Sequence, residues 1–156
     1  MPLDIGAQRR LPDFDYANPD VIFFVTICSF LRATPFTDTR LAREVISSLH
    51  WLRANRGLRI YTYCLMPDHL HLLLQLPPGS KPLGDVLGDM KKFTTRQSWQ
   101  LGYKGYLWQD RFHDHILRKG EAAWPMAEYT LQNPVRKGLV ENAEDYPWSG
   151  LPDPLI

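Results

Sequence analysis

Two histidines separated by a single residue form the pattern in this sequence with the clearest chemical use. His69 and His71 flank Leu70 within a run of apolar residues. Side chains alternate between the two faces of a β-strand, so both imidazoles would point to one face and Leu70 to the other. Imidazole is the commonest protein ligand for metal ions near neutral pH, and the pair could share one ion. The same spacing also fits two histidines on a solvent-facing strand.

A tyrosine and an asparagine four residues apart form a second pattern, nearer the C-terminal end. Tyr129 and Asn133 would lie on one face of a helix, because residues four apart are neighbours on a helix surface. The tyrosine hydroxyl is a weak nucleophile with a pKa near 10, and a nearby metal ion can make it effective. Each residue also has an ordinary interpretation. Tyr129 could be a packing residue, and Asn133 could end a helix before Pro134.

The hydrophobic periodicity predicts the elements that would hold these residues. Short apolar runs rich in β-branched and aromatic residues predict strands over residues 21–28, 58–66, 69–76 and 113–118. Helical spacing predicts helices over residues 37–54, 82–101 and 121–133. The resulting β-α-β-β-α-β-α order predicts an α+β fold of the ferredoxin-like split β-α-β kind. It would be an antiparallel sheet flanked by helices, with the tyrosine on the last helix.

Length and composition indicate one globular domain. The chain has 156 residues, of which 44% are hydrophobic, and we expect a core over about 21–140 and an irregular acidic tail over 141–156. No apolar run reaches the roughly 18–20 residues of a membrane-spanning helix, and residues 1–10 lack the apolar part of a signal peptide. We therefore expect a cytoplasmic location and no membrane partner. Cys28 and Cys64 are expected to be buried, reduced thiols.

Charge is unevenly distributed along the chain. The net charge is only +1, but residues 91–137 hold nine basic and four acidic side chains, whereas residues 138–156 hold four acidic side chains and no basic ones. A locally basic segment can bind phosphates even when the whole chain is nearly neutral. A solvated surface of mixed charge would give the same distribution.

Three blocks of sequence, over residues 64–73, 108–115 and 129–140, resemble a known family. The first contains His69-Leu70-His71, the second begins Trp108-Gln109, and the third runs from Tyr129 through Asn133-Pro134-Val135. In this order and spacing they resemble the single-tyrosine HUH transposases, in which two histidines flank a large hydrophobic residue. The asparagine-proline-valine run is most similar to the REP-associated tyrosine transposases. The resemblance extends over about residues 21–148.

The resemblance implies a transposase that nicks and rejoins single-stranded DNA. His69 and His71 would bind a divalent metal ion, Mg²⁺ or Mn²⁺ in this family, although two imidazoles suit Mn²⁺ or Zn²⁺ better than Mg²⁺. Tyr129 would attack the scissile phosphate and form a 5′-phosphotyrosine link. Relatives of the insertion-sequence type usually have glutamine four residues after the tyrosine, where this chain has Asn133. We expect Asn133 to be the third ligand, because Gln132 is turned about 100° away around a helix.

The implied DNA is single-stranded next to a short imperfect hairpin, as in REP elements. Homodimeric and monomeric forms both fit the motifs. Tyr103, Tyr106 and Trp108 could stack on unpaired bases, although Trp108 could instead close a small core. Lys92 and Arg96 could instead form a charge ladder with Asp85 and Asp89 on their own helix. The candidate phosphate contacts are Arg9, Arg10, Lys91, Lys92, Arg96, Arg111, Arg118, Arg136 and Lys137.

Three other kinds of protein could share parts of this pattern. A domesticated hairpin-binding protein would keep the fold but have lost nicking. A plasmid relaxase or replication initiator usually has a longer chain. An RNA-binding ferredoxin-like module would need a stacking platform, and Phe23 and Phe24 are adjacent, so they face opposite sides of their strand. The family pattern places no ligand at His113 and His115, which we interpret as structural or DNA-facing.

Overall fold

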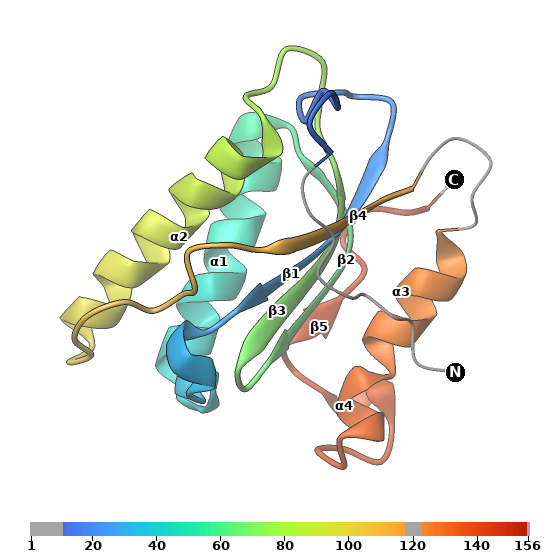
Figure 1. The fold of residues 1–156 in the computed structure, drawn as a ribbon. Coiled ribbons are helices and arrows are strands. Elements are labelled where there is room, and N and C mark those ends of the chain that lie inside the picture. Colours follow the sequence, from blue (N-terminus) through green and yellow to red (C-terminus); the bar gives the residue numbers. More distant parts are fainter. Residues whose placement is uncertain (1–10, 118–122, 156) are drawn as a thin grey trace.

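The computed structural model describes residues 11–117 and 123–155, and it shows helices on both faces of an antiparallel sheet (Figure 1). Arg9, Arg10 and Arg118, three of the predicted phosphate contacts, lie outside the described residues. The sheet order is β4-β1-β3-β2-β5, and every neighbouring pair is antiparallel. This is the α+β, ferredoxin-like plan expected from the sequence.

The elements follow the predicted order closely. The strands are β1 Ile22–Cys28, β2 Arg59–Met66, β3 His69–Gln75, β4 His113–Leu117 and β5 Ser149–Gly150. The α-helices are α1 Thr39–Arg56, α2 Leu83–Gln100, α3 Trp124–Leu131 and α4 Asn133–Arg136. Three short 3-10 turns, η1 Phe30–Arg32, η2 Pro35–Thr37 and η3 Ala143–Asp145, join them.

Local chemistry explains where α1 begins and ends. The Asp38 side chain accepts a hydrogen bond from the Arg40 backbone N–H, which satisfies one of the unpaired amides of the first turn. Gly57 ends the helix with a φ of 69°, a left-handed conformation that glycine adopts without steric cost. The chain can then enter β2 directly.

The sheet has two chemically different faces. Phe23, Val25 and Ile27 of β1 belong to the large core that α1 and α2 cover. The alternate residue Phe24 belongs to a smaller apolar cluster that also contains Met126 of α3. Figure 1 shows α1 and α2 on one side of the sheet and α3 and α4 on the other. The smaller cluster leaves the rest of the second face to polar groups.

Strand register brings the two histidines next to Thr26 and Cys28 of β1. His71 pairs with Thr26 and His69 pairs with Cys28, while β2 and β3 form a hairpin around residues 67–68. Cys28 and Cys64 are buried and free, as expected. Among the residues described, no helix is both long and apolar enough to cross a membrane.

The C-terminal tail is more ordered than the prediction of an irregular segment. β5 pairs with β2 at the edge of the sheet, and the backbone N–H of Leu65 donates to the Trp148 carbonyl. Asp153 accepts hydrogen bonds from Arg53 and from the Ile60 backbone N–H. The tail therefore completes the sheet, through long-range pairing that its proline-rich sequence does not indicate.

Candidate metal centre and DNA-strand site

The two predicted histidines face each other on the sheet surface that α3 and α4 flank. Their Nε2 atoms are 3.1 Å apart, and the ring planes are nearly perpendicular, at 77°. Each Nδ1 atom has its own partner. The Nδ1 of His69 lies 2.7 Å from Asp68 Oδ1, and the Nδ1 of His71 lies 2.9 Å from Thr26 Oγ1. These partners fix both rings and direct both Nε2 atoms to one point.

Burial keeps both imidazoles neutral. His69 and His71 are 9% and 6% exposed, and Phe24 stacks on the His71 ring. Burial, together with the neighbouring His69 and the Arg136 charge, lowers the pKa of His71 to about 3. Burial also lowers the pKa of His69, although the Asp68 carboxylate opposes this. Neutral imidazole is the form that binds metal ions.

Asn133 brings a third polar group to this point. Its side-chain amide nitrogen lies 3.3 Å from His69 Nε2, and the residue is buried. Amide oxygen and nitrogen are interchangeable by a flip of the side chain, so the same position can offer an oxygen. Gln132 is exposed. In the described part of the chain no three His, Cys, Asp or Glu residues form a metal-binding group, so the third donor would be this amide.

Tyr129 and Asn133 lie in two successive helices rather than one. The predicted helix over 121–133 is interrupted, because α3 ends at Leu131 and α4 begins at Asn133. Pro134 has no N–H to continue the hydrogen-bond ladder, which explains the break. Arg136 spans it. Its guanidinium lies 3.7 Å from the centre of the Tyr129 ring and donates to the Tyr129 carbonyl and to Asn133 Oδ1.

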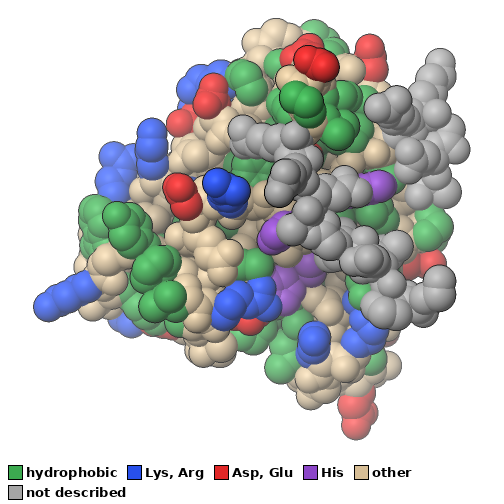
Figure 2. All heavy atoms as spheres, viewed as in Figure 1, with side chains coloured by type: hydrophobic (Ala, Val, Ile, Leu, Met, Phe, Trp, Pro, Cys, Tyr) green, Lys and Arg blue, Asp and Glu red, His purple; other side chains and the backbone are tan. Residues whose placement is uncertain are grey.

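Among the described residues, three cations lie near the histidine pair, and one of them was missed in the sequence. Arg136 and Lys137 were predicted as phosphate contacts, and both are exposed beside the site. Arg32 was not predicted. It forms an ion pair of 3.0 Å with Asp68, the residue that holds His69. No local pattern marks Arg32 or Asp68 as site residues, because their roles depend on contacts between η1 and the β2–β3 turn. Figure 2 shows histidine side chains near the centre of this face, with Lys and Arg side chains beside them.

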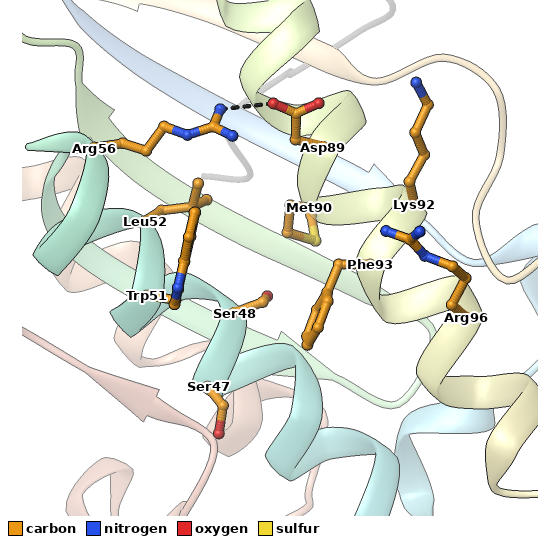
Figure 3. A pocket seen from close by; sticks show the side chains of 10 residues that line it. All are labelled: Ser47, Ser48, Trp51, Leu52, Arg56, Asp89, Met90, Lys92, Phe93 and Arg96. Carbon is orange, nitrogen blue, oxygen red and sulfur yellow. Dashed lines mark hydrogen bonds and ion pairs between the residues drawn. The ribbon is translucent and has the colours of Figure 1, made fainter.

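The predicted contacts on α2 lie away from the histidines. Lys92 and Arg96 are exposed at the rim of a groove of about 540 Å³ between α1 and α2, into which Phe93 points (Figure 3). The ladder with Asp89 considered for them does not form, because Asp89 pairs with Arg56 and Lys81. Lys91 donates to the Asp110 carbonyl, and Arg111 is exposed.

Trp108 is a core residue, which agrees with the core interpretation of the sequence and corrects its alternative placement among the DNA contacts. It is only 5% exposed, its Nε1 donates to Thr94 Oγ1, and its ring packs on Phe36. Tyr106 is 77% exposed and stays a candidate for stacking. His113 pairs with Thr26 and so lies on the same sheet face as His71.

Fold and site together define a class of protein: an α+β domain with a histidine pair on a central strand and a tyrosine on a helix that follows the sheet. The chain belongs to the IS200-like transposase family, whose model matches residues 20–122. The match contains His69 and His71 and ends before Tyr129.

Individual relatives point to one branch of that family. A REP-associated tyrosine transposase of Escherichia coli K12 is 29% identical over 98 residues, which are 63% of this chain and 57% of the relative. A Haemophilus influenzae protein assigned to the same group is 32% identical over 96 residues, which are 55% of this chain and 54% of the relative. The chain thus spans a little over half the length of these curated relatives. The resemblance seen in the three sequence blocks is confirmed.

A solved structure supports the fold. A REP-associated tyrosine transposase bound to a REP hairpin superimposes with a TM-score of 0.71, covering 92% of this chain and 81% of the other at 23% identity. At this identity the likeness establishes the fold alone.

Proposed function

We propose that this chain nicks and rejoins single-stranded DNA next to hairpins, with Tyr129 as the nucleophile and a divalent metal ion at His69, His71 and Asn133. The observation that carries the proposal is the convergence of two neutral imidazole nitrogens and a buried amide at one point of the sheet face. Membership of the IS200-like transposase family supports it, as does the similarity to REP-associated tyrosine transposases.

The donor set fits a metal ion. Metal–nitrogen bonds to histidine are about 2.0–2.1 Å, so two nitrogens at about a right angle around one ion are about 3.0 Å apart. The Nε2 atoms of His69 and His71 are 3.1 Å apart. When bound, a divalent ion would act as a Lewis acid on the scissile phosphate. Two imidazoles and an amide oxygen favour Mn²⁺ over Mg²⁺.

The protein's own groups account for the rest of the reaction. The Tyr129 hydroxyl loses its proton, and its oxygen bonds to phosphorus as the bond from phosphorus to the 3′ oxygen breaks. That oxygen takes up a proton and leaves as a 3′-OH, while the 5′ phosphate stays on the tyrosine. Attack by a 3′-OH reverses the step and releases Tyr129. One phosphoester bond replaces another at each stage, so rejoining needs no ATP. Arg32, Arg136 and Lys137 would hold the phosphate by charge.

A nicking assay tests the proposal. Labelled single-stranded oligonucleotides that carry the hairpin repeats flanking the gene are mixed with the protein in Mn²⁺ or in EDTA, and adducts are resolved on a denaturing gel. We expect a covalent DNA–protein adduct with the natural chain in Mn²⁺, and none with Tyr129→Phe or in EDTA. Tight hairpin binding without an adduct under any metal would overturn the enzymatic proposal and favour a domesticated binding protein.

A further inference from the structure

The turn that follows β1 is held in a strained conformation. Leu31 and Arg32 have φ values of 56° and 54°, in the left-handed region that costs a residue with a side chain about 1 kcal/mol or more. Hydrogen bonds hold the turn on both sides. The Ser29 N–H donates to the Asp68 carbonyl, and the Phe30 N–H donates to the Leu107 carbonyl. Strain that the surrounding structure maintains so firmly often marks a functional segment.

The strained turn displays apolar side chains to solvent. Leu31 is 81% exposed and Phe30 is 40% exposed. The Phe30 ring lies against Tyr106, with ring centroids 5.3 Å apart, and Tyr106 is itself 77% exposed. Neither ring belongs to the hydrophobic clusters of the described residues. Packing of the core therefore does not explain this aromatic pair.

The aromatic pair is connected to the histidine site through the same turn. Arg32 reaches back to Asp68, and Asp68 holds the Nδ1 of His69. The turn starts directly after Cys28, the β1 residue that pairs with His69. In Figure 2, hydrophobic side chains gather toward the C-terminal end of α2, on the same face as the histidines. A strand of nucleic acid that leaves the site past Arg32 would meet Phe30 next.

Beyond Tyr106 the surface continues as a groove of about 640 Å³ along α2. Lys92 and Arg96 line it, and so does Trp99, which is 52% exposed and whose indole N–H donates to the Gly105 carbonyl. None of the ion pairs among the described residues involves Lys92 or Arg96. Aromatic faces that alternate with cations are the features that bind single-stranded nucleic acid without reading its sequence.

We propose that the Phe30–Tyr106 pair is a stacking subsite for an unpaired base of the DNA strand, with the adjoining phosphates directed along the α2 groove past Lys92 and Arg96. The subsite rests on the proposed function for its substrate, single-stranded DNA. It adds a location and a chemical role for residues outside the histidine site. An unpaired base would stack on the aromatic pair. The neighbouring phosphates would lie near Arg32 on one side of the pair and near Lys92 and Arg96 on the other.

Binding without cleavage tests the subsite separately from catalysis. All variants carry Tyr129→Phe and are titrated in EDTA against a short fluorescein-labelled oligodeoxyadenylate, by fluorescence anisotropy. We expect Tyr106→Ala to weaken binding about tenfold relative to the Tyr129→Phe parent, the range found for loss of one base-stacking aromatic, whereas Tyr106→Phe should keep the affinity of that parent. Trp51→Ala, which removes an aromatic side chain that is 52% exposed on α1, against 77% for Tyr106, is the control and should leave the affinity unchanged. Circular dichroism checks that each variant is folded.

A second substrate separates stacking from phosphate binding. An oligonucleotide of the same length that lacks its bases should bind Tyr106→Ala and the parent protein equally. Equal binding of the oligodeoxyadenylate to Tyr106→Ala and its parent would overturn the subsite and leave an exposed apolar patch suited to a protein partner. Nicking by Tyr129 is measured independently. If nicking fails while Tyr106→Ala still loses affinity for the oligodeoxyadenylate, the subsite stands and the enzymatic proposal falls.

Discussion

The presentation of His71 depends on the Thr26 hydroxyl. That group lies 2.9 Å from His71 Nδ1, and it is the only polar partner of this atom that the described residues provide. A partner at one ring nitrogen fixes the orientation of the ring and the tautomer, and thereby leaves the other nitrogen to bind a metal ion. His69 has the stronger, charged partner in Asp68. The two proposed ligands are therefore held in place by different hydrogen-bond partners, one neutral and one charged.

Removal of the Thr26 hydroxyl should weaken metal binding. We expect Thr26→Val, which keeps the shape of the side chain, to reduce Mn²⁺ affinity about tenfold, as measured by isothermal titration calorimetry. Thr62→Val is the matched control. Thr62 is buried in β2, on the other side of β3 from β1, and its hydroxyl has no hydrogen-bond partner among the described residues. That control should leave Mn²⁺ affinity unchanged. An equal loss in both variants would assign the effect to packing and not to the hydrogen bond.

The identity of the third ligand can be decided between two adjacent residues. Asn133 is buried against His69, whereas Gln132 is exposed. Asn133→Ala should lower Mn²⁺ affinity at least tenfold, and Gln132→Ala should not change it. The same titration measures both, with the histidine pair intact in each variant. The reverse result would place the ligand at Gln132.

At the level of elements, Arg136 joins the helix that carries the tyrosine to the helix that carries the asparagine. Its guanidinium covers the Tyr129 ring and donates to the Tyr129 carbonyl at 2.7 Å, across the break between α3 and α4. A planar guanidinium can make these contacts together, and a lysine ammonium cannot. Arg136 therefore positions the proposed nucleophile relative to the proposed metal ligands.

Replacement of Arg136 by lysine tests this positioning role. Arg136→Lys keeps the positive charge, so DNA affinity should change little. The single-turnover rate of adduct formation at saturating DNA should fall about tenfold, since misplacement of a reacting group has costs of this order. Arg136→Gln, which loses the charge as well, should weaken DNA binding in addition. An unchanged rate in Arg136→Lys would reduce Arg136 to a phosphate contact.

A carboxylate adds a charged contact between the tail and the rest of the fold, beside the strand pairing of β5. Asp153 pairs with Arg53 of α1 and accepts from the Ile60 N–H of β2, and both ionic side chains are under one-third exposed. Asp153→Asn keeps an acceptor but loses the charge. We expect the free energy of unfolding to fall by about 1–2 kcal/mol, measured by urea denaturation. Asp145→Asn, which changes an exposed carboxylate of the same tail, is the control. It should lower the free energy of unfolding by much less.

For the whole molecule, paired carboxylates predict that stability falls in acid. Hydrogen bonds from Arg53 lower the pKa of Asp153, and Arg56 and Lys81 lower that of Asp89, from an ordinary value of 3.8. A lowered folded-state pKa contributes stability that is present above the unfolded value and is lost as pH falls through the folded value. The contribution of these carboxylates should therefore decline below about pH 5. The buried His69 and His71, whose pKa values are lowered from an ordinary 6.5, should make the free energy of unfolding begin to fall already below that value. Urea denaturation across this range, with EDTA present, should give a shallower decline for Asp153→Asn. The same dependence of stability on pH in Asp153→Asn and in the natural chain would contradict this role for Asp153.

The basic segment of the sequence does not become one basic surface. Lys92 and Arg96 project from α2, which covers one face of the sheet, whereas Arg136 and Lys137 follow α3 on the other side. The basic side chains of this segment that the structure describes are thus divided between two regions. Charge along a sequence indicated a phosphate-binding protein, but the sheet that separates the helices decides where phosphates could bind.

Local interactions explain what the sequence by itself determined. Strand alternation put His69 and His71 on one face, apolar periodicity gave the order of strands and helices, and three motif blocks identified the family. Each of these depends on residues close together in the chain. The break in the tyrosine helix at Pro134 was also visible as a helix end, although α4 beyond it was not predicted.

Only the tertiary structure decided which distant residues complete the site. Thr26 reaches His71 across 45 positions of sequence and Asn133 reaches His69 across 64. Arg32 pairs with Asp68 because the strained turn η1 lies against the β2–β3 hairpin. The burial of Trp108 and the strand formed by the tail have the same origin. Such contacts depend on sheet register and packing, which no local pattern of residues specifies.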